Sequence, residues 1–248
     1  MTQTGAGARR LSYGRVARFE PEVCDGDRHG VGGLSGRSRT LAAGVGGRET
    51  DRMFIETVPE DTADGALAEY YRQQRAAWGF LPNYAGAFSG RPDVAQAWNA
   101  LNATIRNNMD RRRFEIATIA AARVLRSTYC TAAHSTFLRD VCGDDATMRS
   151  IAAEPSGAGL AGPDRAVYEF AAKVAADAAS VRQADVDQVR AAGLTDQEIA
   201  DVVYAAAARS FFTRVLDGLG AQLDAQTAQS LPEPIRDAMI VGRPAAAP

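Results

Sequence analysis

Helical periodicity fills the chain from Asp61 onward and constrains its fold more than any other feature. Alanine is abundant there, runs of β-branched residues are short, and no Asn-Gly or Asp-Gly turn separates alternating strands. We therefore predict an all-α, multi-helix bundle. The expected helices cover residues 64–78, 92–107, 111–126, 128–141, 145–153, 163–178, 182–192 and 196–223.

The last expected helix carries start and burial signals of its own. Thr195 and Glu198 predict a capping box at its beginning. An apolar stripe along the helix must be buried, and we expect a kink near Ser210. The stripe consists of Ile199, Val202, Val203, Ala206, Phe211, Val215, Leu216 and Leu219.

Residues 1–52 differ in kind from the rest of the chain. They hold 11 of the 23 glycines and nine arginines, and their apolar residues follow neither a helical nor a strand period. We expect a Gly/Arg-rich disordered extension, because such a segment cannot bury a core. Met53 opens the first stretch with a folded pattern, which suggests that translation naturally begins there.

The other end of the chain also has few core residues. Several prolines and an Ala-Pro terminus predict a loose Pro/Ala tail over residues 231–248. The helical domain is therefore expected to cover residues 53–230.

Composition excludes several partner classes. With 28 basic and 30 acidic residues, the net charge of −2 creates no field that recruits nucleic acid or an anionic membrane. No apolar run approaches the length of about 18 residues that a membrane span needs. Three cysteines and two histidines permit neither a disulfide framework nor a zinc pattern, so we expect a cytoplasmic protein in a reducing compartment.

Cys130 and His134 form the first candidate for chemistry. They are four residues apart, so on one helix the thiol and the imidazole share a face and can touch directly or through water. Ser127 is a suitable N-cap residue, which places Cys130 in the first helical turn, where the helix dipole favours a thiolate. Against this interpretation, a lone cysteine in a helix is more often an inert buried residue.

Glu115 strengthens the functional interpretation. If the helix that carries Cys130 runs back beside the helix that carries Glu115, the carboxylate can reach His134 and orient the imidazole. An acid in the first turn that only complements the helix dipole is the alternative.

These residues resemble a known signature. The spacing of Glu115, Ser127, Cys130 and His134 is similar to Glu-x11-Cys-x2-Cys-x3-His of the alkylhydroperoxidase D and carboxymuconolactone decarboxylase superfamily, with Ser127 in place of the first cysteine. Two further segments resemble the peroxidase-related branch of that superfamily. They are Trp78 to Asn83 (Trp-Gly-Phe-Leu-Pro-Asn) and a C-terminal part that includes 194–199 and 212–220.

The resemblance implies an all-helical subunit that forms homo-oligomers and holds no organic cofactor or metal. Where both cysteines are present it implies a thiol-dependent peroxidase, in which Glu and His relay a proton from the thiol nearer the His. Carried over, Cys130 attacks a hydroperoxide, and His134 and Glu115 form the relay. Ser127 cannot supply the resolving thiol, and Tyr129 stands where some members have another histidine.

Cys142 is not expected to replace the missing cysteine. On a continuous helix it lies about 18 Å from Cys130, whereas a disulfide needs Cα atoms within about 7 Å. We therefore expect a one-cysteine hydroperoxide reductase with antioxidant activity, completed by an external thiol, either a small molecule or a partner protein.

Two other functions stay open at this stage. One is cofactor-free acid-base catalysis, a decarboxylation or isomerisation of a carboxylated lactone, in which His134 shuttles a proton and Cys130 only lines the pocket. Arg123, Arg126 and Arg214 are candidate carboxylate anchors for it. The other is a helical oligomer that has lost catalysis.

Aromatic residues gather in the sequence around the Pro82 turn. Core packing or a subunit interface is the commoner use of such residues, and a hydrophobic lid over Cys130 is the less common one. The residues are Trp78, Phe80, Tyr84, Phe88 and Trp98. The run from Arg111 to Arg113 is interpreted as a solvated helix start.

Overall fold

A computed structural model describes residues 53–247, and every regular element in this part of the chain is helical. The predictions made for residues 1–52 concern residues outside this range. The α-helices are α1 (Gly65–Trp78), α2 (Pro92–Asn107), α3 (Arg111–Val124), α4 (Thr128–Asp140), α5 (Asp145–Ala153), α6 (Gly162–Asp177), α7 (Gln183–Ala191), α8 (Asp196–Leu219), α9 (Ala225–Ser230) and α10 (Glu233–Met239). Helices α1 to α8 confirm the all-α prediction and start within a residue of the expected positions.

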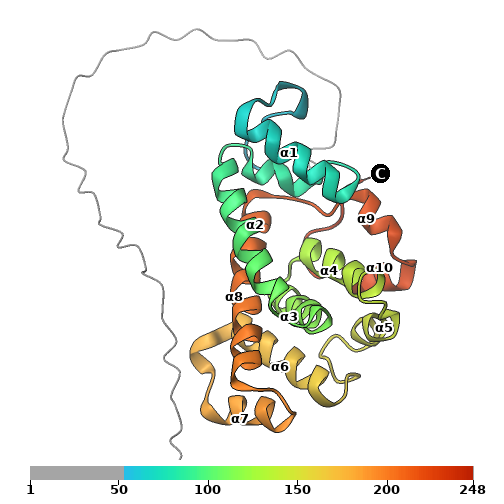
Figure 1. Ribbon diagram of the computed structural model, residues 1–248. Helices are drawn as coiled ribbons and strands as arrows, with labels where there is room; N and C mark the ends of the chain where they lie inside the picture. Colours follow the sequence, from blue (N-terminus) through green and yellow to red (C-terminus); the bar gives the residue numbers. More distant parts are fainter. Residues whose placement is uncertain (1–52, 248) are drawn as a thin grey trace, which may run out of the picture. The chain divides into compact units, whose positions relative to one another are not determined.

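Helix α3 lies at the centre of the domain (Figure 1). All its residues from Phe114 to Ala122 are buried, and it packs against α4, α6 and α8. Four of these nine residues are alanines, which let the neighbouring helices approach closely. The central position of α3 carries Glu115 into the interior with the apolar residues around it.

Helix α8 is the longest helix in the described part of the chain, and its start is as predicted. The Thr195 hydroxyl accepts from the backbone N–H of Glu198, and the Glu198 carboxylate accepts from the Thr195 N–H. The helix is unbroken at Ser210, where a kink was expected, and the Ser210 hydroxyl donates to the carbonyl of Ala206. It ends at Leu219, earlier than predicted, where Gly220 adopts a left-handed conformation with φ of 84°.

The buried stripe of α8 also differs from the prediction in its second half. Phe211 is 44% exposed, whereas Arg209, Phe212 and Leu216 are buried. The stripe continues from Val202 at intervals of three and four residues through these three positions. An arginine thus occupies a core position.

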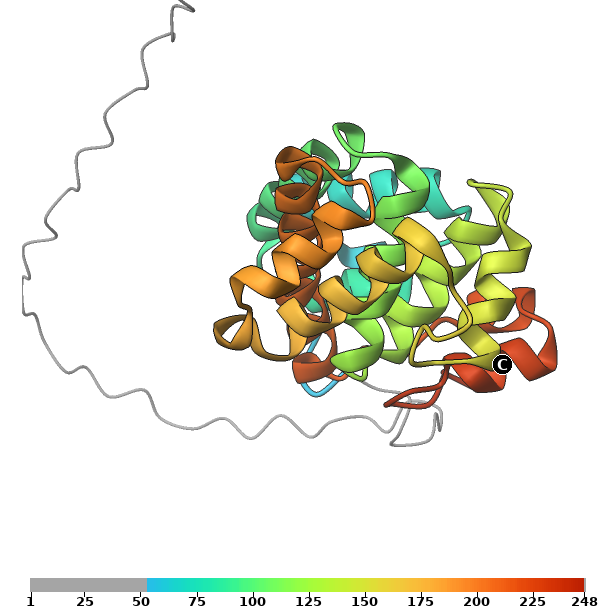
Figure 2. The same cartoon turned by 90° about the horizontal axis from the view of Figure 1, so that it is seen from below.

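Residues after Leu231 form structure rather than the predicted loose tail. Helix α10 contains the buried Ile235 and Met239, and both ribbon views show α9 and α10 beside α4 and α5 (Figures 1 and 2). A proline in the first helical turn, here Pro234, is compatible with a helix because its missing N–H would be unsatisfied there anyway.

The last described residues hold the sharp turn between α3 and α4. Arg126 has a φ of 59° in this turn, and Thr128 Oγ1 accepts from the backbone N–H groups of Val241 (3.2 Å) and Gly242 (3.0 Å). A Cβ atom on Gly242 would lie 1.9 Å from the carbonyl oxygen of Arg126, so only glycine fits there. The start of α4 is therefore fixed from outside by the end of the domain.

Candidate functional site

Glu115 and His134 meet in the interior, as the sequence predicted. Helix α4 runs back beside α3, and His134 Nδ1 lies 2.5 Å from Glu115 Oε2. The second carboxylate oxygen accepts from Arg111 Nε, also at 2.5 Å. Glu115 is fully buried, and both of its oxygens are thus engaged by partners.

The charges of this pair follow from its surroundings. Burial raises the pKa of the Glu115 carboxyl, but His134 and Arg111 outweigh that effect, so the pKa lies below its ordinary value. Burial lowers the pKa of His134 to about 4, and Arg209 acts in the same direction. At neutral pH we therefore assign a neutral imidazole whose Nδ1–H donates to an ionised Glu115. Its Nε2 keeps a lone pair and can accept a proton.

Cys130 is the third residue of α4, as predicted, with Ser127 at the N-cap. Only 2% of Cys130 is exposed. Burial raises the pKa of the Cys130 thiol, whereas the Arg209 guanidinium, whose Nη1 lies 3.6 Å from Sγ, lowers it. Cys130 and His134 were expected to touch directly or through water. A direct hydrogen bond between them is not among those of residues 53–247, and both side chains line the same cavity.

Arg209 is the site residue that the sequence analysis missed. It is 3% exposed, and its guanidinium lies over the rings of Trp98 (5.6 Å) and Phe212 (5.4 Å). Its Nε has no hydrogen-bond partner, and no carboxylate among residues 53–247 forms an ion pair with it. Its position within an apolar stripe was the signal that could have identified it.

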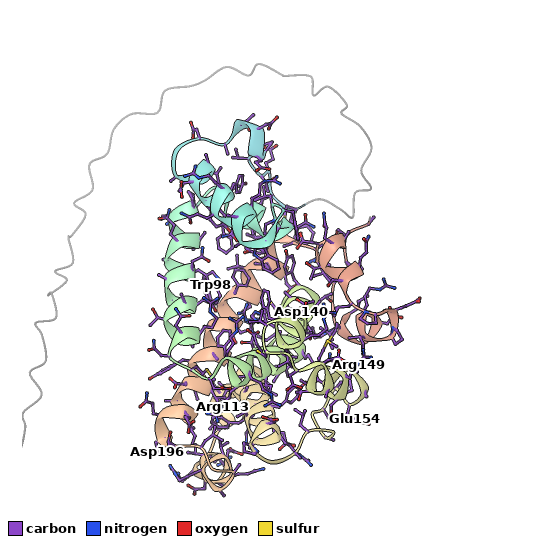
Figure 3. The ribbon with its side chains drawn as sticks, turned by 45° about the vertical axis from the view of Figure 1, so that its right-hand side comes forward. Trp98, Arg113, Asp140, Arg149, Glu154 and Asp196 are labelled. Carbon is purple, nitrogen blue, oxygen red and sulfur yellow. The ribbon has the colours of Figure 1, made fainter. Side chains whose placement is uncertain are left out.

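A cavity of about 520 Å³ connects these groups. Trp98, labelled in Figure 3, projects from α2 into its wall and stacks on Phe212 of α8, with ring centres 4.8 Å apart. The lining consists of Gln73, Gln74, Ala77, Trp78, Tyr84, Trp98, Asn99, Asn102, Ala103, Arg106, Arg111, Phe114, Glu115, Tyr129, Cys130, Ala133, His134, Phe137, Val141, Arg209 and Phe212. Seven of these 21 residues are aromatic, four are amides and four are charged, so the cavity has both apolar and polar walls.

The aromatic residues near the Pro82 turn divide between two uses. Trp78, Tyr84 and Trp98 line the cavity that Cys130 also lines, and Trp98 belongs to the hydrophobic core as well. Phe88 is a core residue, and Phe80 packs on Trp78 outside the lining.

Ser127 and Tyr129 occupy the two substituted positions of the predicted signature. Ser127 is fully buried, but its hydroxyl makes neither a capping bond nor any other hydrogen bond within the described residues. Tyr129 donates to Asp224, which also accepts from the backbone N–H of Asn83 at 2.7 Å. Tyr129 therefore links the cavity wall to the segment after α8.

Cys142 lies just beyond α4 and is partly buried. Both cysteines in the described range are free. The position of Cys142 agrees with the expectation that it does not serve Cys130 within one subunit.

The arginines that the sequence singled out have other roles than those proposed. Arg112 is not a solvated residue, because it joins α3 to Asp144 and Asp164, with 2.6 Å between Nη1 and Asp164 Oδ1. Arg113, labelled in Figure 3, pairs with Glu198 of α8 (2.5 Å). Arg111 belongs to the site.

The expected carboxylate anchors do not line the cavity. Arg123 donates to the carbonyl of Ala238, Arg126 donates to the carbonyl of Val241, and Arg214 is exposed. Arg209 and Arg106 are the arginines that line it beside Arg111. No group of three or more His, Cys, Asp or Glu side chains within residues 53–247 is arranged to hold a metal ion.

Solved structures identify the fold. This chain superimposes on the alkylhydroperoxidase AhpD core of an uncharacterised peroxidase-related protein from Ralstonia eutropha JMP134 with a TM-score of 0.64 and 20% identity, over 71% of this chain and 94% of that one. The helical domain therefore has the alkylhydroperoxidase D-like fold, and the predicted resemblance is confirmed at the level of the fold.

Two further structures show the range of proteins with this fold. An uncharacterised peroxidase-related protein from Silicibacter sp. TM1040 matches with a TM-score of 0.58 and 20% identity, over 70% of this chain and 90% of that one. The debrominase Bmp8, as a cysteine-to-alanine variant in complex with 2,3,4-tribromopyrrole, matches with a TM-score of 0.59 and 16% identity, over 74% and 98%. No family model and no curated protein matches the sequence.

None of the helices in residues 53–247 combines the length and the hydropathy that a membrane crossing requires.

Proposed function

We propose that this protein is a one-cysteine, thiol-dependent hydroperoxide reductase. The observation that supports this most is the position of Cys130, which lines a cavity and has a guanidinium 3.6 Å from its sulfur. A thiolate is the nucleophile in peroxide reduction, and a nearby positive charge stabilises it. The similarity to peroxidase-related proteins agrees with this proposal.

The reaction begins with proton removal from Cys130. Nε2 of the neutral His134 accepts the proton, directly or through a water molecule, and the ionised Glu115 stabilises the resulting imidazolium. The thiolate then attacks the distal oxygen of the hydroperoxide. As the S–O bond forms, the O–O bond breaks and the alkoxide takes up the proton from His134. The products are an alcohol and a sulfenic acid on Cys130.

Regeneration requires two equivalents of an external thiol. The first thiol condenses with the sulfenic acid, which gives a mixed disulfide and water. The second thiol attacks that disulfide, releases Cys130 as a thiol and leaves the external reductant as a disulfide. Because Ser127 has no sulfur, it cannot form an internal disulfide with Cys130 in place of the first of these steps.

A stoichiometric pulse of cumene hydroperoxide followed by intact-mass analysis tests this function. We expect one added oxygen atom on Cys130, trapped by dimedone, and no reaction in Cys130→Ser. His134→Ala should slow the step without abolishing it. A rate no greater than that of a free thiol in solution would refute the proposal. A parallel assay with 2,3,4-tribromopyrrole examines whether the same thiol instead removes bromine, as the name of Bmp8 indicates for that protein.

Acid-base catalysis on a carboxylated small molecule is the second candidate. It is favoured by the Glu115–His134 pair, which is complete without the thiol, and by burial, which raises the pKa of Cys130. Arg209 would then bind the carboxylate of the substrate. Cys130→Ala should retain this activity and His134→Ala should lose it, which is the reverse of the pattern expected for a peroxidase. Inactivity in both assays would favour a helical oligomer without catalysis.

A further inference from the structure

The burial of Cys130 restricts what can regenerate it. The residue is 2% exposed, and its side chain lines the cavity of about 520 Å³. The other cysteine in the described range, Cys142, is a free thiol beyond the end of α4 and does not line the cavity. The reducing thiol must therefore come into the cavity from outside.

A folded protein is too large to deliver that thiol. A domain of about 100 residues has a radius of gyration of about 13 Å, whereas the cavity falls within the range of about 300–1,000 Å³ that holds small organic ligands. A redox protein presents its cysteine on its own folded surface, which is too large to enter a cavity of this volume. The size of the cavity points to a small-molecule thiol.

The charges that face the cavity select among small thiols. Arg111 is neutralised by Glu115, and His134 is neutral at pH 7 because burial lowers its pKa. Arg106 and Arg209 form no ion pair with a carboxylate in the described part of the chain. With the thiol uncharged, the lining therefore carries two arginines without an ion-pair partner. The carboxylate of Asp217, which also acts on the Cys130 thiol, does not line the cavity.

After Cys130 is oxidised, its sulfur supplies no negative charge to Arg209 during the second half of the cycle. A thiolate at Cys130 would neutralise Arg209, whose Nη1 lies 3.6 Å from Sγ. A sulfenic acid or a mixed disulfide carries no such charge at neutral pH. Arg209 thus lacks an anionic partner at the stage when the reductant must bind.

Arg106 is the more exposed of the two arginines. It follows Trp98 by eight residues on α2, which is about 12 Å along the helix axis, and the ring of Trp98 lies under the guanidinium of Arg209. Arg106 is half-buried and Arg209 is buried, so positive charge stands both nearer the solvent and beside the sulfur.

We propose that the physiological reductant is a low-molecular-weight thiol bearing a carboxylate, which enters the hydroperoxide cavity and is attracted by Arg106 and Arg209. This rests on the proposed function and specifies its partner. In the first step the entering thiol forms an S–S bond to Cys130 as the sulfenic oxygen leaves in water. In the second step another molecule of the same thiol breaks that bond and is oxidised to the disulfide.

Disulfide exchange tests the proposal without any hydroperoxide. Cys130 is labelled with 2,2′-dipyridyl disulfide in the folded, full-length chain carrying Cys24→Ser and Cys142→Ser, and release of 2-thiopyridone is followed by absorbance. The attacking thiols are 3-mercaptopropionate, 2-mercaptoethanol, cysteamine and reduced thioredoxin. Each rate is divided by the ionised fraction of the thiol.

We expect the anionic thiol to react about tenfold faster than the cationic one, with the neutral thiol between them and thioredoxin slower than all three. Arg106→Gln should reduce this preference, and high salt should reduce it too. Arg149→Gln is the matched control, because Arg149 is an exposed residue of α5 outside the cavity (Figure 3).

Three results would overturn the proposal. They are a preference for the cationic thiol, a faster reaction with thioredoxin, and failure of the dipyridyl reagent to label Cys130 in the folded protein. Charge selectivity without any reaction of Cys130 with hydroperoxides would instead refute the peroxidase function and leave the selectivity of the cavity in place.

Discussion

Replacement of Arg209 by methionine should make the Cys130 thiol markedly more basic. The guanidinium Nη1 lies 3.6 Å from the sulfur, and both groups are buried. Two unit charges about 4 Å apart attract each other by about 4 kcal/mol at an effective dielectric constant of about 20. This equals about 3 pKa units at about 1.4 kcal/mol per unit.

Water that enters the vacated space will recover part of this energy, so we expect a rise of about 2 units. The thiolate fraction at neutral pH then falls about 100-fold, whereas the more basic thiolate gains about 10-fold in nucleophilicity at a Brønsted slope of about 0.4–0.5. The net result is a reaction about 10-fold slower at neutral pH and a faster plateau at high pH.

The assay is the pH-rate profile of alkylation by iodoacetamide, a neutral reagent, in the chain without Cys24 and Cys142. Arg209→Lys is the matched variant, because it keeps the charge and should shift the midpoint less than Arg209→Met. Circular dichroism checks that both variants are folded. A midpoint that stays in place, or that moves to lower pH in Arg209→Met, would refute the argument.

Three other predictions concern His134, Ser127 and Gly242. Because the folded-state pKa of His134 is lowered to about 4 from 6.5, the unfolded state binds more protons between these values, and stability should fall by about 2 kcal/mol from pH 7 to pH 5; urea unfolding of His134→Gln should show a smaller loss. Ser127→Cys should form a disulfide with Cys130 after one peroxide turnover, seen as a loss of two hydrogen atoms by mass, and persistence of the sulfenic acid would contradict this. Gly242→Ala should destabilise the domain by about 1–3 kcal/mol, since its Cβ would lie 1.9 Å from Arg126 O, and an unchanged melting temperature would argue against it.

The elements with regular sequence signals could be predicted well. Helical periodicity identified α1 to α8, and the capping box at Thr195 marked the start of α8. The contact between Glu115 and His134 was predictable too, because Glu115 lies two to three turns before the end of α3 and His134 lies about two turns after the start of α4, so antiparallel packing places them at similar heights. Local rules suffice for features of this kind.

Features that depend on distant partners could not be predicted in the same way. Arg112 looked solvated because its partners Asp144 and Asp164 lie on other helices. The sequence did not identify Arg209 as a site residue because arginine is rarely a core residue. The aromatic rings of Trp98 and Phe212, which lie against its guanidinium, stabilise it in the core. In α10, prolines were interpreted as helix breakers although Pro234 lies in the first turn.

Contacts made by Asp224 indicate that the cavity forms late in folding. Its carboxylate ties together Asn83 and Tyr129, which lie 141 and 95 residues earlier in the chain. Contacts over such separations form late, because much chain entropy is lost before they contribute. In a partly folded or nascent chain, Cys130 would therefore be exposed to solvent. Oxidants would react with its thiol without the selection that a finished cavity imposes. Discrimination among reactants emerges only with the completed tertiary structure.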